Sequence, residues 1–203
     1  MRKRTLLVSI TVACVVGAAA FGWMTIRRGF SARDNPSAIE TLIATTARQL
    51  AVPSQYRQLR NPLSSSADLR AGMEHFADHC ATCHANDGSG DTLFGKGLYP
   101  KPPDMRQKET QMKSDGELYY TIENGIRLTG MPAFGEEHAK AGDMETWNLV
   151  LLIRHLPKQT AEELQQMEQL NPKTENERQE EDEEQNFLRG GSTKSSKPKS
   201  HNQ

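Results

Sequence analysis

One short pattern, Cys80-Ala81-Thr82-Cys83-His84, limits what this chain can fold into more than any other feature of its sequence. Two thiols on one helical turn, two residues apart, can add to the two vinyl groups of a porphyrin, and the small residues between them let the backbone press against the porphyrin edge. The imidazole that follows lies under the ring centre, where it can take an axial position on the iron. The pattern therefore predicts one covalently attached c-type haem, bound through Cys80, Cys83 and His84.

Two other uses of a C-x-x-C pair agree less well with the rest of the chain. A thioredoxin-like pair lies at the end of a strand in a βαβ unit, and no stretch of this sequence alternates as a strand would. A zinc site needs two further ligands at paired spacing, which His138 and His155 do not have. His75 and His79 lie one helical turn apart and could bind a metal, but histidines at such positions are more often solvated or hydrogen-bonded.

Charge and cysteine content exclude two classes of protein. The net charge of −1 argues against a nucleic-acid partner, because such a partner normally requires a marked basic excess. The chain has three cysteines, Cys14, Cys80 and Cys83, and these could form at most one bridge. A disulfide framework is therefore excluded.

Residues 1–28 read as a membrane anchor or a signal segment. The basic start MRKR precedes an apolar run over residues 5–26, which as a helix would be about 33 Å long and could cross a bilayer. Three alanines at 18–20 offer a site for signal cleavage. The apolar run continues past them, and Trp23 stands where an interfacial aromatic side chain is expected, so an uncleaved transmembrane helix is the favoured prediction.

Residues 29–62 contain three prolines around the stretch AIETLIATTARQLAV. Within that stretch Ile39, Leu42, Ile43 and Leu50 recur at the spacing of one helix face. We expect a short helix in a spacer, or an extension that packs on the domain that follows.

Residues 63–160 are predicted to form the main domain, and its fold class is all-α. Capping residues, helical periodicity and Gly or Pro stops indicate three helices separated by loops rich in glycine and proline. The helices are expected over residues 66–80, 114–125 and 145–156, with loops over 86–105 and 130–135.

Residues 161–203 are dominated by Glu, Gln, Lys and Ser. Such a segment buries too little apolar surface to overcome the entropy of ordering it. Apart from one polar helical segment over 161–170, we expect this tail to be largely disordered.

A loop methionine is the expected second axial ligand of the iron. Met131 lies between a glycine and a proline, which allow the loop to approach the ring and hold it rigid, and Phe134 follows closely. Met105 and Met112 lie in or after the loop nearest the proximal side. His138 is the alternative, and it would give a bis-imidazole iron of lower potential.

Five segments taken together resemble a class I monohaem cytochrome c of the membrane-anchored bacterial type: CATCH, GLYPKPPDM, ELYYTIENGI, GMPAFG and WNLVLLIRHLP. The resemblance covers about residues 69–157. It implies three to five helices around one haem, with the first helix packed across the last. It also implies that His84 and Met131 coordinate the iron, and that the carbonyl of Pro102 or Pro103 holds the proximal imidazole.

The haem pocket is expected to have an apolar lining, and the residues that the pattern suggests for it are Leu98, Tyr99, Met105, Ile122, Met131 and Phe134. A dry pocket and thioether ligation favour the reduced, less charged iron.

With both axial positions filled, the iron has no open site for a substrate, so the sequence predicts a single-electron carrier without catalytic residues. The chain could also be the cytochrome subunit of a larger membrane or periplasmic oxidoreductase complex. A third possibility is a haem-based gas sensor or peroxidase in which Met131 is displaced.

The expected partners are redox proteins: a quinol-oxidising complex, a terminal oxidase or a periplasmic dehydrogenase. Family members receive their haem outside the cytoplasm. The resemblance therefore implies a domain on the outer, periplasmic face of a bacterial inner membrane, anchored through the N-terminal helix. If that segment were cleaved, the protein would be soluble in the periplasm.

Overall fold

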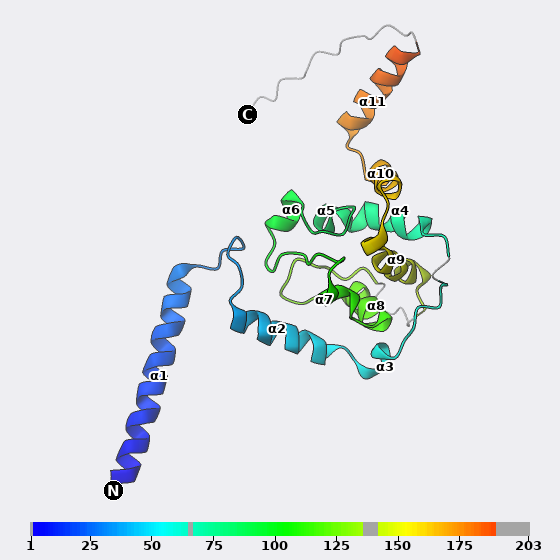
Figure 1. Ribbon diagram of the computed structural model, residues 1–203. Helices are drawn as coiled ribbons and strands as arrows, with labels where there is room; N and C mark the ends of the chain where they lie inside the picture. Colours follow the sequence, from blue (N-terminus) through cyan, green and yellow to red (C-terminus); the bar gives the residue numbers. More distant parts are fainter. Residues whose placement is uncertain (1, 65–66, 136–141, 190–203) are drawn as a thin grey trace, which may run out of the picture.

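The computed structural model describes residues 2–64, 67–135 and 142–189, and every regular element within these ranges is a helix. In chain order they are α1 (Arg2–Arg28), α2 (Ala38–Ala51), α3 (Ser54–Arg57), α4 (Arg70–His79), α5 (Ala81–His84), α6 (Leu93–Lys96), α7 (Lys108–Gln111), α8 (Asp115–Asn124), α9 (Met144–His155), the 3-10 helix η1 (Leu156–Lys158), α10 (Ala161–Leu170) and α11 (Glu175–Leu188). The prediction of an all-α fold is confirmed. Figure 1 shows α4 to α9 gathered in one group, with α1 and α11 projecting from it.

Helix α1 is long and apolar enough to cross a membrane. Within its span from Lys3 to Arg28, an 18-residue stretch has a mean hydropathy of 2.1, and none of that stretch is buried against the rest of the structure. The helix ends at Arg28, and the next residue, Gly29, has a φ of +80°, the left-handed conformation typical of a C-terminal cap. Its length and composition fit either an anchor or a signal segment.

Helix α2 forms where the periodicity predicts it. Ser37 and Glu40 form a capping box, in which each side chain pairs with the backbone N–H of the other residue. The apolar face of this helix does not pack on the domain, however, because Ile39, Leu42 and Ile43 are exposed to solvent. The apolar face of α2 is therefore not what holds this segment to the domain.

The core of the domain is the crossing of α4 and α9 (Figure 1). Gly72 of α4 lies against the backbone of α9, and an added Cβ there would be 2.6 Å from the carbonyl oxygen of Asn148. Because no side chain separates the two backbones at this point, the helices approach closely enough to bury Phe76 between them. Trp147 and Val150 of α9 belong to the same buried cluster.

Helix α8 packs against α9. It begins at a capping box between Ser114 and Glu117. Its residue Gly116 lies directly against the backbone of Tyr56 in α3, where any Cβ would overlap the carbonyl oxygen. The ring of Tyr56 also stacks on Tyr119 with centroids 6.4 Å apart. The end of the spacer is thus packed against the domain.

Polar contacts join α8, α9 and the spacer at one point. The carboxylate of Asp115, in the first turn of α8, accepts hydrogen bonds from the guanidinium of Arg154 in α9. It also accepts one from the backbone N–H of Asn61, at 3.1 Å. The Asn61 side chain donates in turn to the carbonyl of Trp147, at 2.9 Å.

The segment directly after residue 160 forms the predicted helix, but it is docked on the domain, which the sequence did not indicate. The expected polar helix is α10, capped by Thr160 and Glu163, and it packs against α4. Its Met167 is completely buried in the main core cluster. Little in the sequence indicated this docking, because a short helix needs few apolar side chains to dock. Here Met167, with Leu164 and Leu170 beside it, is enough.

Helix α11 stands where disorder was expected. Thr174 and Glu177 form a further capping box, and the Glu- and Gln-rich sequence that follows has good intrinsic helix propensity. Its described side chains are all exposed, so the helix is held by local interactions and not by a core. This segment is therefore not buried, as its polar composition predicts, but the same composition does not prevent it from forming a helix.

Candidate haem site

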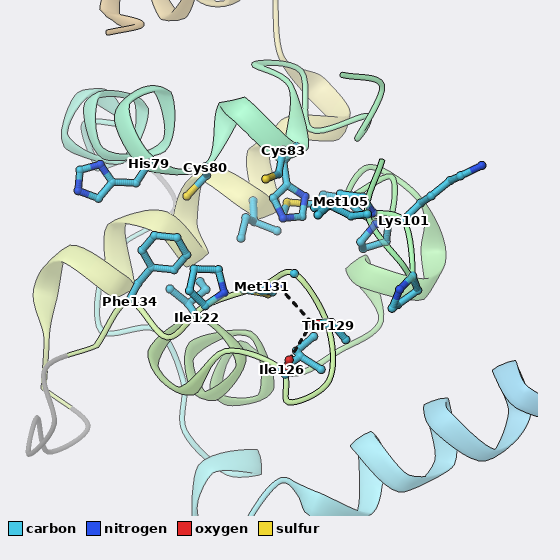
Figure 2. A pocket seen from close by; sticks show the side chains of 18 of the residues that line it. His79, Cys80, Cys83, Lys101, Met105, Ile122, Ile126, Thr129, Met131 and Phe134 are labelled. Carbon is cyan, nitrogen blue, oxygen red and sulfur yellow. Dashed lines mark hydrogen bonds between the residues drawn. The ribbon is translucent and has the colours of Figure 1, made fainter. Parts of the chain in front are cut away.

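The cysteine motif lies where α4 passes into α5. Cys80 is the C-cap of α4, and α5 carries the rest of the motif. The backbone N–H of His84 donates to the carbonyl of Cys80 at 2.9 Å, which closes one helical turn across the motif. Figure 2 shows both sulfur atoms directed into the same pocket from this turn. Both thiols are free.

The pocket lies between the motif and the loop that follows α8. It contains about 800 Å³ of space free of atoms, part of it open to solvent. Most of its lining is apolar. The lining residues are Arg48, Phe76, His79, Cys80, Cys83, His84, Leu98, Pro100, Lys101, Pro102, Pro103, Met105, Ile122, Ile126, Thr129, Gly130, Met131, Pro132, Phe134, Leu149 and Ile153.

His84 has the protonation state that a metal ligand needs. Burial lowers the pKa of its imidazole to about 4, so the ring is neutral at neutral pH. Its Nδ1 atom is buried and has no hydrogen-bond partner within the part of the chain that the structure describes. A buried ring nitrogen without a partner is costly in a finished protein. A neutral ring whose Nδ1 has no partner among the described residues is not tied up by the protein and is free to serve as a ligand.

Pro102 and Pro103 both line the pocket, but neither carbonyl is hydrogen-bonded to His84. The carbonyl oxygen of Pro102 lies against Gly90, where an added Cβ would be 2.7 Å from it. Gly90 has φ +74° and its N–H donates to the carbonyl of His84, so the loop bends tightly around the motif.

The thiols are held in their protonated form. Burial, with a smaller contribution from the neighbouring Cys83, raises the pKa of Cys80 to about 12. Burial also raises the pKa of Cys83. Two neutral thiols beside a neutral imidazole make an uncharged wall, which suits a large apolar ligand better than an ion.

A charged clamp fixes the loop that carries the prolines. Arg106 binds both oxygens of Asp104, at 2.8 and 2.9 Å, and reaches back to Asp87 at 2.7 Å. Hydrogen bonds from Arg106 hold the pKa of Asp104 below its usual range. Because Asp87 follows the motif by three residues and Asp104 follows the prolines, the clamp joins the two ends of the loop next to His84.

Met131 lies on the opposite wall of the pocket (Figure 2). Its backbone is held by two hydrogen bonds: its N–H donates to the Thr129 hydroxyl at 3.2 Å, and its carbonyl accepts from the N–H of Ile126 at 3.1 Å. The next turn of the loop docks on the end of α8, where Gly125 has φ +63° and lies against the backbone of Pro132. The methionine thus stands on a fixed loop.

Two other predicted pocket residues differ in their placement. Phe134 lines the pocket, and its N–H donates to the carbonyl of Ile122 at 3.1 Å. Tyr99 is not among the lining residues; its hydroxyl donates to Glu40 of α2 instead. His138, the alternative ligand, lies outside the described residues.

Among the pocket residues not predicted from the sequence are two basic side chains. Arg48 comes from α2 and Lys101 from the proline-rich loop, and both line the pocket. No acidic side chain is among the described lining residues. Two cations around a largely apolar cavity suit a flat apolar ligand that carries carboxylates, as haem does through its propionates. The run of prolines beside Lys101 was a usable signal, but nothing in the sequence placed Arg48 near the motif.

Residues 67–153 match the family model described as cytochrome C oxidase, cbb3-type, subunit III. A comparison with curated proteins finds no match. The matched region contains the motif, both walls of the pocket except Arg48, and the α4–α9 crossing. Covalent attachment of a c-type haem and haem-based electron transfer are the properties of such a domain. The resemblance drawn from the five sequence segments is therefore confirmed, and residues 67–153 form a cytochrome c domain.

Proposed function

We propose that this chain is a single-electron carrier with one covalently attached haem c, coordinated by His84 and Met131. The observation that carries the proposal is the juxtaposition of a neutral, partly unsatisfied His84 and a fixed Met131 loop on opposite walls of one apolar pocket that also contains both thiols. When bound, the haem supplies a one-electron Fe(II)/Fe(III) couple.

The chain's own residues would have separate roles. Cys80 and Cys83 would hold the haem through thioethers, and His84 would supply one ligand to the iron. Met131 would supply the other, which would leave no site for a substrate, so the chain itself would not be a catalyst. Phe76, Phe134 and Ile122 exclude water, which favours the reduced state.

We further propose that α1 stays attached and holds the domain on the outer face of a bacterial inner membrane. The support is its span of 26 residues without a buried side chain and the need for haem attachment outside the cytoplasm. Such a tether confines the search for a redox partner to the membrane plane.

A second candidate is a subunit of a respiratory oxidase complex. The observation in its favour is the match to a family described as subunit III of a cbb3-type oxidase. Copurification of the chain from membranes with a stoichiometric larger subunit would favour this candidate over a free carrier. A quinol-oxidising complex or a periplasmic dehydrogenase would be the alternative donor.

The ligand assignment is tested by Met131→Ala in the purified haem protein. We expect the variant to keep its covalent haem and to lose the thioether charge-transfer band at the red end of the visible spectrum. Its reduced form should bind carbon monoxide, and its potential should fall by on the order of 100 mV, since a thioether stabilises Fe(II).

Two matched variants serve as controls. Met112→Ala removes an exposed methionine and should leave spectrum and potential unchanged. If His138→Ala abolished the sixth ligand while Met131→Ala did not, the histidine would be the ligand. Ready carbon monoxide binding by the unmodified protein would instead support a sensor or peroxidase.

A further inference from the structure

The apolar face of α2 has no partner within the described residues. Ile39, Leu42, Ile43 and Leu50 are 72, 67, 63 and 74% exposed. With 3.6 residues per turn, they fall within an arc of about 100°. Four large aliphatic side chains on one open helix face form a contiguous apolar surface, and such surfaces mark sites of interaction.

The opposite face of the same helix is the one turned toward the domain. Of the residues of α2, all of which the structure describes, Thr45 alone is shielded from solvent to an intermediate degree. Arg48, one turn further on, lines the haem pocket. Glu40 accepts a hydrogen bond from Tyr99. The helix therefore rests on the domain through polar side chains and presents its apolar side outward, the reverse of an ordinary docked helix.

The membrane anchor restricts what can cover this face. Nine residues, Gly29–Ser37, separate the end of α1 from the start of α2. Fully extended they would span about 30 Å, and a turn closed by the Asp34 N–H and the Ser31 carbonyl shortens them. A helix tethered this closely to a transmembrane segment stays near the bilayer surface.

Charge points to the same surface. Residues 27–60 contain six arginines and two acidic residues, which gives a net charge of +4 in a chain whose total is −1. A basic segment with one apolar helix face is the composition of an interfacial helix, whose cations meet anionic headgroups while its apolar side chains enter the acyl boundary. A second copy of the chain would bring like charges together.

We propose that α2 lies in the surface of the anionic phospholipid bilayer that α1 enters, with Ile39, Leu42, Ile43 and Leu50 among the lipids. The inference rests on the proposed anchor. Because the polar side of α2 supplies Arg48 to the pocket, this arrangement holds the open edge of the haem pocket close to the membrane at a set orientation.

The test uses the full-length haem protein in nanodiscs of phosphatidylcholine and phosphatidylglycerol, with the haem reduced. In a Cys14→Ser background, a nitroxide is attached at Leu42→Cys and, as matched control, at Ala51→Cys on the other side of α2. Collision of each label with oxygen, which is enriched in lipid, is compared with its collision with a water-soluble nickel complex. We expect the ratio to be severalfold higher for the Leu42 label.

A second pair of variants tests whether the apolar face of α2 is what places the label in lipid. Ile43→Glu places a charge on the apolar face of α2, and Ala44→Glu places one outside it. Both positions are exposed, so neither change should disturb the fold. Ile43→Glu should return the Leu42 label to the accessibility of an aqueous site, and Ala44→Glu should not.

A label on the native Cys14 distinguishes the two proposals. If Cys14 is in lipid and the Leu42 label is in water, the anchor holds and the interfacial position of α2 is overturned. If the Leu42 label is shielded from both reagents, a second copy of the chain covers the face, and the proposal is equally overturned. If the Cys14 label is itself in water, the anchor fails and the inference with it.

Discussion

Arg48 illustrates how a single residue outside the cytochrome domain can belong to its pocket. It reaches the cavity from α2. Lys101, from the proline-rich loop, is the other cation among the described lining residues. Burial lowers the pKa of the neighbouring Lys113, and the charge of Arg48 adds to this effect. Such a concentration of positive charge is costly without an anion, and the propionates of a bound haem would supply one.

We expect Arg48→Gln to lower the midpoint potential, because removing a positive charge favours the more positive Fe(III) state. The shift should be on the order of 1 kcal/mol, about 40 mV for one electron. A redox titration of the haem protein measures it. Arg60→Gln, which removes an exposed arginine outside the pocket lining, is the control, and an equal shift in both variants would exclude a local role for Arg48.

The contact between Arg106 and Asp104 should make the free energy of unfolding depend on pH in the acid range. Asp104 has a depressed pKa in the folded state, so it stabilises the fold above its unfolded pKa of about 3.9 and loses that contribution as pH falls below it. Arg106→Gln should cost about 1 kcal/mol at neutral pH. The difference in unfolding free energy from the parent should shrink between about pH 4 and pH 2, as followed by urea unfolding. A difference that did not depend on pH would contradict the clamp.

At the scale of helices, local signals located the elements and tertiary contacts determined their ends and partners. The capping box at Ser114 and the stop at Gly125 predicted α8 closely. The start of α4 was expected near residues 66–68, but the helix begins at Arg70, whose N–H donates to the Asp68 carboxylate. The short helices α6 and α7 carry no periodic signal, because four residues are too few to show one.

The close approach of α4 and α9 predicts that replacing a glycine by alanine destabilises the fold, the opposite of what helix propensity alone predicts. Alanine is a better helix former than glycine, yet Gly72→Ala would place a Cβ 2.6 Å from the backbone of Asn148. The helices would have to separate, at a cost of about 1–3 kcal/mol. Urea unfolding monitored by circular dichroism measures this. In the same helix, Ala71→Gly alters an exposed site and should cost only its propensity, about 1 kcal/mol.

Considered as a whole, the molecule has a domain that continues beyond the family match, which ends at residue 153. Composition assigned everything after residue 160 to a polar tail, because α10 has few apolar side chains. Composition averages over a segment, however, and cannot detect that Met167 alone fills a space beside α4. For the same reason the periodicity of α2 predicted a helix without revealing that its apolar face points away from the domain.

Met167→Ala should therefore destabilise the fold as a core substitution does, by about 2–4 kcal/mol. Leu188→Ala removes an exposed side chain of α11 and should change the unfolding free energy by less than about 0.5 kcal/mol. Thermal unfolding of both variants provides the comparison. Equal stabilities would mean that α10 contributes nothing to the core.

The two walls of the pocket come together only when the chain folds, because His84 and Met131 are 47 residues apart in the sequence. In an unfolded chain that has reached the outer face of the membrane, a rigid planar cofactor can approach both thiols freely, whereas the finished fold encloses them. We therefore expect cofactor attachment to precede the completion of folding.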